Sequence, residues 1–402
     1  MQKSEHYGSY PKNINPPIYL AYAFRIFFLI LPYYIVLNII LWGFVYSGYL
    51  NLNFMDDILT WHIYEFLYGV GSAGICAFVL TAVPEFFKKE LPVVDKKLLY
   101  IFIMWILGRV SFWFIDYIHI YIVAFLNCFL LLYTIYLVYK PFFKDNNQKH
   151  TSILICIITI FLIQVLFFLS YTSLININSF EILKFSLSFF MILILLVLRR
   201  VNMETVNNLL EKKDINKVFL AKSFRYNIAI FTIIIFATVS LFFPNNYALT
   251  WIAFACSFAI LSLLNDYFIQ EPSIFKSYLI LSLISLILIM SLGYFSIGYA
   301  FLMQEFFEIS NYIHFLTTGA FGLAFYLVMV VVSYVHTGRE LVIENKAFLG
   351  ALLIIFATIL RVFFESQNIY LISTIFWASA FLIYSFSYSS YLLKKRVDNL
   401  PG

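Results

Sequence analysis

Twelve apolar stretches, each long enough to cross a bilayer, limit what this chain can fold into. A transmembrane helix needs about 20 mostly apolar residues. The stretches cover roughly residues 24–48, 61–83, 97–115, 118–139, 152–173, 180–198, 226–243, 247–268, 277–300, 309–335, 346–364 and 369–392. Of all residues 63% are apolar and 12% charged, whereas soluble domains are about 45–50% apolar and about 25% charged. The sequence therefore predicts an all-α, polytopic membrane protein with twelve transmembrane helices in a single integral membrane domain, residues 1–402.

The charged residues of the connections predict how these helices are oriented. Lys and Arg gather at both termini and in the connections after even-numbered helices, while the connections after odd-numbered helices carry acidic residues such as Asp56, Asp57 and Asp116. Because cytoplasmic loops carry the excess of Lys and Arg, we expect both termini in the cytoplasm. The predicted cytoplasmic segments are residues 1–18, 199–225 and 394–402. The basic segment 199–225 is read either as an amphipathic helix along the headgroups or as a solvated linker.

An internal repeat links four ionisable residues within the apolar stretches. His62 and Arg109 are 47 residues apart, as are His314 and Arg361, and the two pairs are offset by 252 residues. The repeat predicts that helices 1–3 duplicate helices 9–11 within three four-helix units. In the third copy, Lys184 takes the place of the histidine.

The predicted topology places these four residues in one layer near the outer membrane face. Two imidazoles at one depth can supply both axial ligands of a haem iron, and guanidinium groups match the carboxylates of the propionates. We therefore predict a haem b site with His62 and His314 on the iron, Arg109 and Arg361 on the propionates, and Glu65 orienting one of these groups. The alternative is that each histidine bonds to a neighbouring helix and each arginine pairs with an acid or reaches the headgroups.

Several motifs in order along the chain resemble the NnrS family. They are FRIFF (24–28), WHIYEFLYGV (61–70), CAFVLTAVP (76–84), RRV (199–201), IHFLTTGAFG (313–322) and HTGREL (336–341). The resemblance implies a bacterial inner-membrane protein of about twelve helices that contains haem and copper and is associated with denitrification and nitric oxide resistance. The family's first motif usually reads WHxHE, and Tyr64 stands here in place of its second histidine.

The predicted layout is also similar to the main subunit of haem–copper oxidases. The chain lacks histidines in helices 6 and 7, where those oxidases hold copper, so a binuclear reduction centre is disfavoured. Copper is implied by the family resemblance alone, because no cluster of Cys or Met supports a site. The four cysteines lie far apart within apolar stretches, and we interpret them as packing residues.

The leading functional hypothesis is a haem b protein that acts in nitrosative-stress tolerance by electron transfer or by sensing redox state or gas. Its expected partners are the bilayer, nitric oxide, and quinol or another redox partner, with no nucleic acid. The alternative is a twelve-helix secondary transporter without haem, in which Lys184, Glu65 and Arg109 form the substrate site. No catalytic motif is present, and an enzyme of this kind would be a quinol-linked oxidoreductase.

Overall fold

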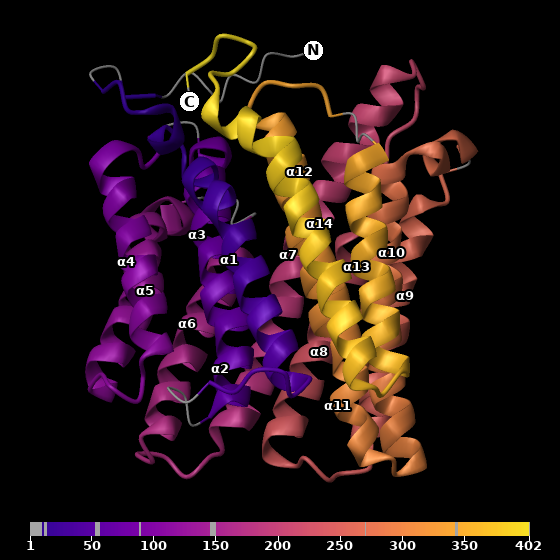
Figure 1. The fold of residues 1–402 in the computed structure, drawn as a ribbon. Helices are drawn as coiled ribbons and strands as arrows, with labels where there is room; N and C mark the ends of the chain where they lie inside the picture. Colours follow the sequence, from indigo (N-terminus) through magenta and orange to yellow (C-terminus); the bar gives the residue numbers. More distant parts are fainter. Residues whose placement is uncertain are drawn as a thin grey trace. The chain divides into compact units, whose positions relative to one another are not determined.

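Helices make up the regular structure of the part of the chain that is described, and no strand occurs in that part (Figure 1). The computed structural model describes residues 10–11, 14–52, 57–87, 90–144, 150–269, 271–341 and 345–401. The prediction of an all-α membrane protein is confirmed. Asp56 and most of the predicted polar N-terminus lie outside the described residues.

Eleven helices in the described ranges are long and apolar enough to cross a membrane. They are α1 (Ala23–Tyr46), the continuous run α2 (Ile58–Tyr64), η3 (Glu65–Val70) and α3 (Gly71–Phe86), α5 (Ile120–Lys144), α6 (Thr151–Tyr171), α7 (Ser179–Lys212), α8 (Ser223–Phe242), α9 (Ala248–Leu261) with η4 (Ser262–Tyr267), α10 (Tyr278–Met303), the run η6 (Phe306–Glu308), α11 (Ile309–Tyr312), η7 (Ile313–Phe315), η8 (Leu316–Phe321) and α12 (Gly322–Val335), α13 (Asn345–Phe363), and α14 (Gln367–Leu393). The chain is therefore a multi-pass membrane protein.

The remaining predicted transmembrane helix forms α4 (Asp95–Trp113). Asp95, Lys96, Lys97 and Arg109 all lie within its 19 residues, so α4 lacks the long stretch of low charge found in each of the eleven. Two short helices, η2 (Ile18–Leu20) and η5 (Pro272–Lys276), precede α1 and α10. A total of twelve membrane crossings stays a prediction, as do the cytoplasmic termini.

The chain divides into two compact units. Unit 1 comprises Met1–Ser186, Val328–Val342 and Phe381–Gly402, and unit 2 comprises Leu187–Leu327 and Ile343–Ala380. Each unit is described by itself below. That the units act as one membrane domain stays a prediction.

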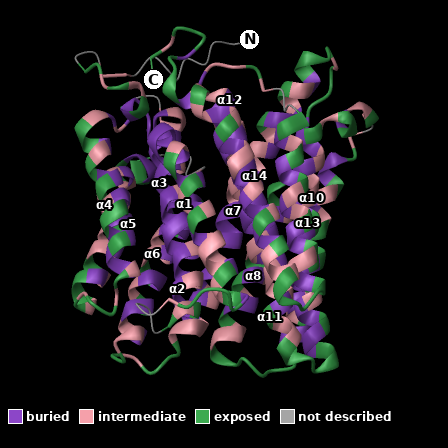
Figure 2. Ribbon diagram, in the orientation of Figure 1, coloured by how far each residue is buried: buried purple, intermediate pink, exposed green. Residues whose placement is uncertain are grey.

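In unit 1, the helix run from Ile58 to Phe86 is the most buried of the candidate membrane spans. It packs against α1 and α5, while α4 packs against α5 and α5 against α6. Exposed apolar side chains such as Tyr100, Val110 and Phe125 cover the outer faces of α4 and α5 (Figure 2). Such faces suit contact with lipid, and the buried run carries the polar residues of interest.

In unit 2, α10 packs along α9, and α8 packs on the other side of α9. The run from Phe306 to Val335 packs against α10 and α13. It is the second most buried candidate span, and it carries the other predicted iron ligand. Gly319 lets this run approach α10 closely, because a Cβ at Gly319 would overlap the side chain of Ile289.

The first half of the predicted connection 199–225 continues α7 without a break to Lys212. Val206 and Leu210 on this extension are fully buried, and Asn202 Nδ2 donates to the Tyr226 hydroxyl at 3.2 Å. Residues 199–212 are therefore neither a linker nor a separate surface helix. The arginines at 199 and 200 mark where the helix becomes polar, and they do not end it.

Candidate functional site

His62 lies in the second turn of α2, in unit 1. The helix starts where the Asp57 side chain accepts a hydrogen bond from the Thr60 amide at 3.0 Å, which satisfies an otherwise unpaired N–H group. The His62 ring lies flat on Trp42 of α1, with ring centroids 3.9 Å apart and planes 6° apart. Its edge faces Phe66 at 5.1 Å. The half-buried imidazole is thus held in one plane by aromatic rings.

Glu65 and Arg109 form an ion pair inside unit 1. Arg109 Nη1 lies 2.8 Å from Glu65 Oε2, and the two side chains are 6% and 0% exposed. The Tyr34 hydroxyl donates to the same carboxylate oxygen. A buried ion pair is stable only when further hydrogen bonds offset the loss of water. Glu65 is therefore the partner of Arg109, as in the alternative considered from the sequence.

Asn127 of α5 connects this ion pair to a wider polar network. Its Oδ1 accepts from Arg109 Nη2 and, at 3.1 Å, from the Tyr64 hydroxyl. The Tyr64 hydroxyl in turn accepts from Gln164 Nε2 of α6 at 2.9 Å. The tyrosine in the WHxHE-like motif thus takes part in a hydrogen-bond network that orients Arg109.

A π-helical turn, η3, carries Glu65 and brings its carboxylate onto a glycine. A Cβ at Gly69 would overlap Glu65 Oε2 and lie 2.9 Å from Arg109 Nη1. The Gly69 carbonyl accepts from Trp105 Nε1 of α4 at 2.9 Å. A π turn shifts the backbone hydrogen-bond register and is frequent at functional sites. Here the wider turn and the missing side chain make room for the ion pair.

His314 lies in η7 of unit 2 and is half-buried. Its Nδ1 is 2.8 Å from the Ser310 carbonyl oxygen. Since a carbonyl only accepts, Nδ1 carries the proton and Nε2 keeps its lone pair. This is the tautomer that a metal-binding histidine needs, with its other nitrogen oriented by a backbone group.

Arg361 of α13 makes a polar and an aromatic contact within unit 2. Its Nη1 donates to Asn311 Oδ1 at 2.9 Å, and its Cζ lies 4.8 Å from the centroid of the Tyr370 ring. Asn311 Nδ2 donates to Glu365 Oε1 at 2.6 Å and to Glu308 Oε2 at 3.2 Å. Asn311 therefore orients Arg361 next to two carboxylates.

A second π-helical turn, η8, begins two residues after His314. Its Thr318 carbonyl accepts from Trp377 Nε1 at 3.0 Å. Each predicted iron ligand is thus followed by a π turn that receives an indole hydrogen bond. The three-fold repeat stays a prediction, and this shared feature agrees with the matching of helices 2 and 10.

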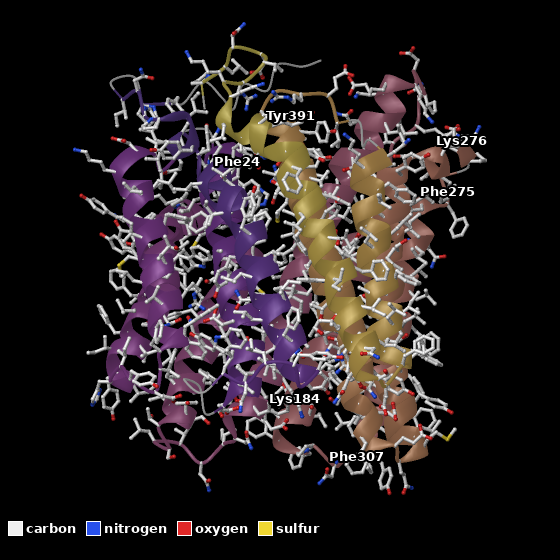
Figure 3. All side chains as sticks on the ribbon, in the orientation of Figure 1. Phe24, Lys184, Phe275, Lys276, Phe307 and Tyr391 are labelled. Carbon is white, nitrogen blue, oxygen red and sulfur yellow. The ribbon has the colours of Figure 1, made fainter. Side chains whose placement is uncertain are left out.

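Lys184 lies at the end of unit 1 opposite to Phe24 and Tyr391 (Figure 3). Its Nζ is 2.8 Å from Glu181 Oε1, and both side chains are partly exposed. The ammonium group also lies over the Phe180 ring at 4.7 Å. Lys184 therefore forms a surface ion pair with Glu181 rather than with Glu65.

The cysteines are free thiols, and Cys76 contacts the Thr134 hydroxyl at 3.3 Å. Within the described ranges, no group of three or more His, Cys, Asp or Glu side chains could hold a metal ion.

Sequence reasoning missed the neutral partners Tyr34, Trp42, Asn127 and Asn311. Asn127 could have been singled out, because amides within membrane helices normally bond across helices. Asn311 could have been singled out by its position one turn before His314. The aromatic partners gave no signal among 47 phenylalanines and 30 tyrosines.

Comparisons with known proteins give one positive result. No curated protein matches the chain. A family profile described as NnrS protein matches residues 18–396, which include all five predicted site residues. The match covers nearly the whole chain, and the sequence motifs noted above fall within it. This chain therefore belongs to the NnrS family.

Proposed function

We propose that this protein binds haem b with His62 and His314 as axial ligands and acts in the response to nitric oxide. Membership in the NnrS family supports the nitric oxide response. The observation that carries the haem proposal is the bond between His314 Nδ1 and the Ser310 carbonyl, because it leaves Nε2 as a metal donor. The use of both histidines by one iron rests on the sequence repeat.

The surroundings of His62 also fit an axial ligand. The parallel stack on Trp42 restricts rotation of the imidazole. A ligand ring held in a fixed plane loses less conformational freedom when it binds a metal. The Trp42 stack would thus fix the orientation of the His62 ring in unit 1, as the Ser310 carbonyl fixes the His314 ring in unit 2.

The two arginines would contribute unequally. Arg361 is half-buried and donates to the neutral Asn311 amide, and we propose that its guanidinium also pairs with a propionate through charge-assisted hydrogen bonds. Arg109 already pairs with Glu65, so it would bind a propionate only in competition with that carboxylate. We therefore propose Arg361 as the main propionate anchor and Glu65 as the residue that sets the position of Arg109.

A haem held by His62 and His314 would supply one-electron transfer, redox sensing or gas sensing. The protein's own contribution is to orient two imidazoles and to exclude water from the pair formed by Glu65 and Arg109. We further propose a location in the bacterial inner membrane. We assign no residue to copper.

The test is a pyridine haemochrome assay with metal analysis on the purified protein. The wild type is expected to contain one haem b per chain, and His62→Ala and His314→Ala are each expected to lose it while still inserting into the membrane. His119→Ala is the control, because His119 is exposed at the start of α5. Full haem content in either ligand variant would remove that histidine from the iron, and a protein purified without haem would refute the proposal.

A further inference from the structure

The HTGREL segment follows α12 in unit 1 and has no part in the proposed haem site. Its first residue, His336, places Nδ1 3.1 Å from Glu85 Oε1 at the end of α3. Gly338 has a positive φ of 74°, which favours glycine. The chain therefore makes a fixed turn at this end of the unit, and Arg339 follows directly.

The C-terminal tail docks onto this turn. Arg396 Nη1 donates to the His336 carbonyl at 2.7 Å, and the Val397 amide donates to the Thr337 carbonyl at 3.2 Å. The Asp398 carboxylate pairs with Arg396 and covers Gly338 so closely that a Cβ there would lie 2.6 Å from the carboxyl carbon. Hydrogen bonds thus join the turn and the tail into one structure.

Two guanidinium groups are buried beneath this structure. Arg25, near the start of α1, is fully buried and donates through Nη1 to the carbonyls of Leu392 at 2.7 Å and Lys394 at 3.0 Å. Arg396 is 5% exposed. Both cations lie where helix α14 or α12 ends, and the helix dipole favours positive charge there.

Arg339 presents a third guanidinium group nearer the surface. Its Cζ lies 4.0 Å from the centroid of the Tyr391 ring, so the planar group stacks on the tyrosine. Its Nη1 donates to the Thr337 carbonyl over a long distance of 3.4 Å. A stacked guanidinium keeps its N–H edges directed sideways, where they match a phosphate. Figure 3 shows Tyr391 and Phe24 at this end of unit 1.

Together with the exposed Lys394 and Lys395, these arginines form a basic cluster. We define the basic cluster as Arg25, Arg339, Lys394, Lys395 and Arg396. Among the described residues, Asp398 pairs with Arg396, Glu85 faces His336, and Glu340 follows Arg339 in the turn. The five cations of the cluster outnumber these three carboxylates, which leaves an excess of positive charge. Part of that charge is buried, where water and salt screen it least.

We propose that the basic cluster binds a phosphate group, with Arg339 as the residue that contacts it. The cluster lies where the membrane helices α1, α12 and α14 begin or end, and the sequence predicts that this end faces the cytoplasm. Basic sites between transmembrane helices on that side bind the headgroups of anionic lipids. The phosphate can belong to such a headgroup or to a free phosphate ion. The inference does not depend on haem.

The experiment is native mass spectrometry of the full-length protein in detergent, titrated with dioleoyl phosphatidylglycerol and, separately, with dioleoyl phosphatidylcholine. Wild-type protein is expected to bind the anionic lipid about tenfold more tightly. Arg339→Gln is expected to remove most of that preference. Lys276→Gln removes the same charge from an exposed lysine of unit 2 and is expected to change nothing.

Two further measurements complete the test. Displacement of phosphatidylglycerol by millimolar inorganic phosphate would identify a free phosphate site, and resistance to displacement would identify a lipid headgroup. Equal binding of both lipids by the wild type, or equal binding of phosphatidylglycerol by wild type and Arg339→Gln, would overturn the proposal. If Arg339→Gln does not elute as a single species, the double variant Lys394→Gln/Lys395→Gln replaces it. This variant is likewise expected to lose most of the preference for phosphatidylglycerol, and binding equal to that of the wild type would overturn the proposal.

Discussion

At the scale of single residues, Glu65 and Arg109 form a deeply buried ion pair. Their side chains are almost inaccessible to solvent, so neither can be solvated by water if the other is lost. Tyr34 and Asn127 supply the hydrogen bonds that the pair would otherwise take from water. Each charge therefore depends on the other for its stability.

Replacing Glu65 by glutamine is expected to destabilise the protein strongly. The substitution leaves the Arg109 guanidinium buried without a counter-charge, which typically costs about 3–5 kcal/mol. The measurement is thermal unfolding in detergent, followed for Glu65→Gln, for Arg109→Gln and for the double variant. Glu181→Gln is the matched control, because its pair with Lys184 is partly exposed and exposed pairs contribute about 0–1 kcal/mol.

The double variant decides whether the pair acts as a unit. If the two charges matter to each other, removing both is expected to restore part of the stability lost with either one. Additive losses in the double variant, or a Glu65→Gln protein as stable as the control, would mean that the ion pair is not what holds these helices together.

At the scale of elements, the two π turns are the feature that ordinary helix patterns do not reveal. A π turn adds one residue to a helical turn without changing the apolar composition, so the sequences EFLYGV and LTTGAF carry no visible mark of it. Glycine is present in both, at Gly69 and Gly319, and both allow a neighbouring side chain to lie against the backbone. At both positions, neighbouring side chains occupy the space that a side chain at the glycine would need.

The substitution Gly69→Ala tests whether η3 exists to accommodate the ion pair. The added methyl group would collide with Glu65 and Arg109, and overpacking of this kind costs about 1–3 kcal/mol. Gly108→Ala on α4 is the control, since its Cβ would lie at an ordinary distance of 3.6 Å from the nearest atoms. The comparison is made by thermal unfolding, and equal stability of the two variants would show that the ion pair tolerates a side chain at position 69.

Helix positions were far more predictable than helix contacts. The ends of the predicted stretch 152–173 and of α6 (Thr151–Tyr171) differ by one or two residues, because the lengths of such helices follow from the thickness of the bilayer. The end of α7 was missed by fourteen residues, because polarity changes there while helix propensity does not. The pairing of Arg109 with Glu65 depends on hydrogen bonds to Asn127 and from Tyr34. Such contacts between helices leave no periodic signal in a single sequence.

At the scale of the whole molecule, the number of membrane crossings depends on whether α4 crosses the membrane. It has 19 residues, which gives a length of about 28 Å and nearly matches the hydrocarbon core. Asp95, Lys96 and Lys97 lie in its first turn, and its fourth charged residue, Arg109, pairs with Glu65 inside unit 1. Three of the four charged residues of α4 therefore lie at its start, and the fourth is buried in an ion pair.

Reporter fusions on either side of α4 test this interpretation. Truncated chains ending at Glu90 and at Tyr117 are fused to alkaline phosphatase, which is active outside the cytoplasm, and to a fluorescent protein, which is fluorescent inside it. The positive-inside rule predicts fluorescence after Glu90 and phosphatase activity after Tyr117. The same side for both fusions would mean that α4 does not cross the membrane, and it would place the two chain termini on opposite sides.

The contact between Arg25 and the end of α14 has a consequence for biosynthesis. The two residues joined by the bond to Leu392 are separated by 367 positions. At about 5–20 residues per second on the ribosome, Arg25 is exposed for roughly 20–70 s before its carbonyl partners have been made. During that interval the inserted helix α1 carries a guanidinium group whose acceptor carbonyls have not yet been synthesised. This end of the protein can therefore be completed only after translation is finished.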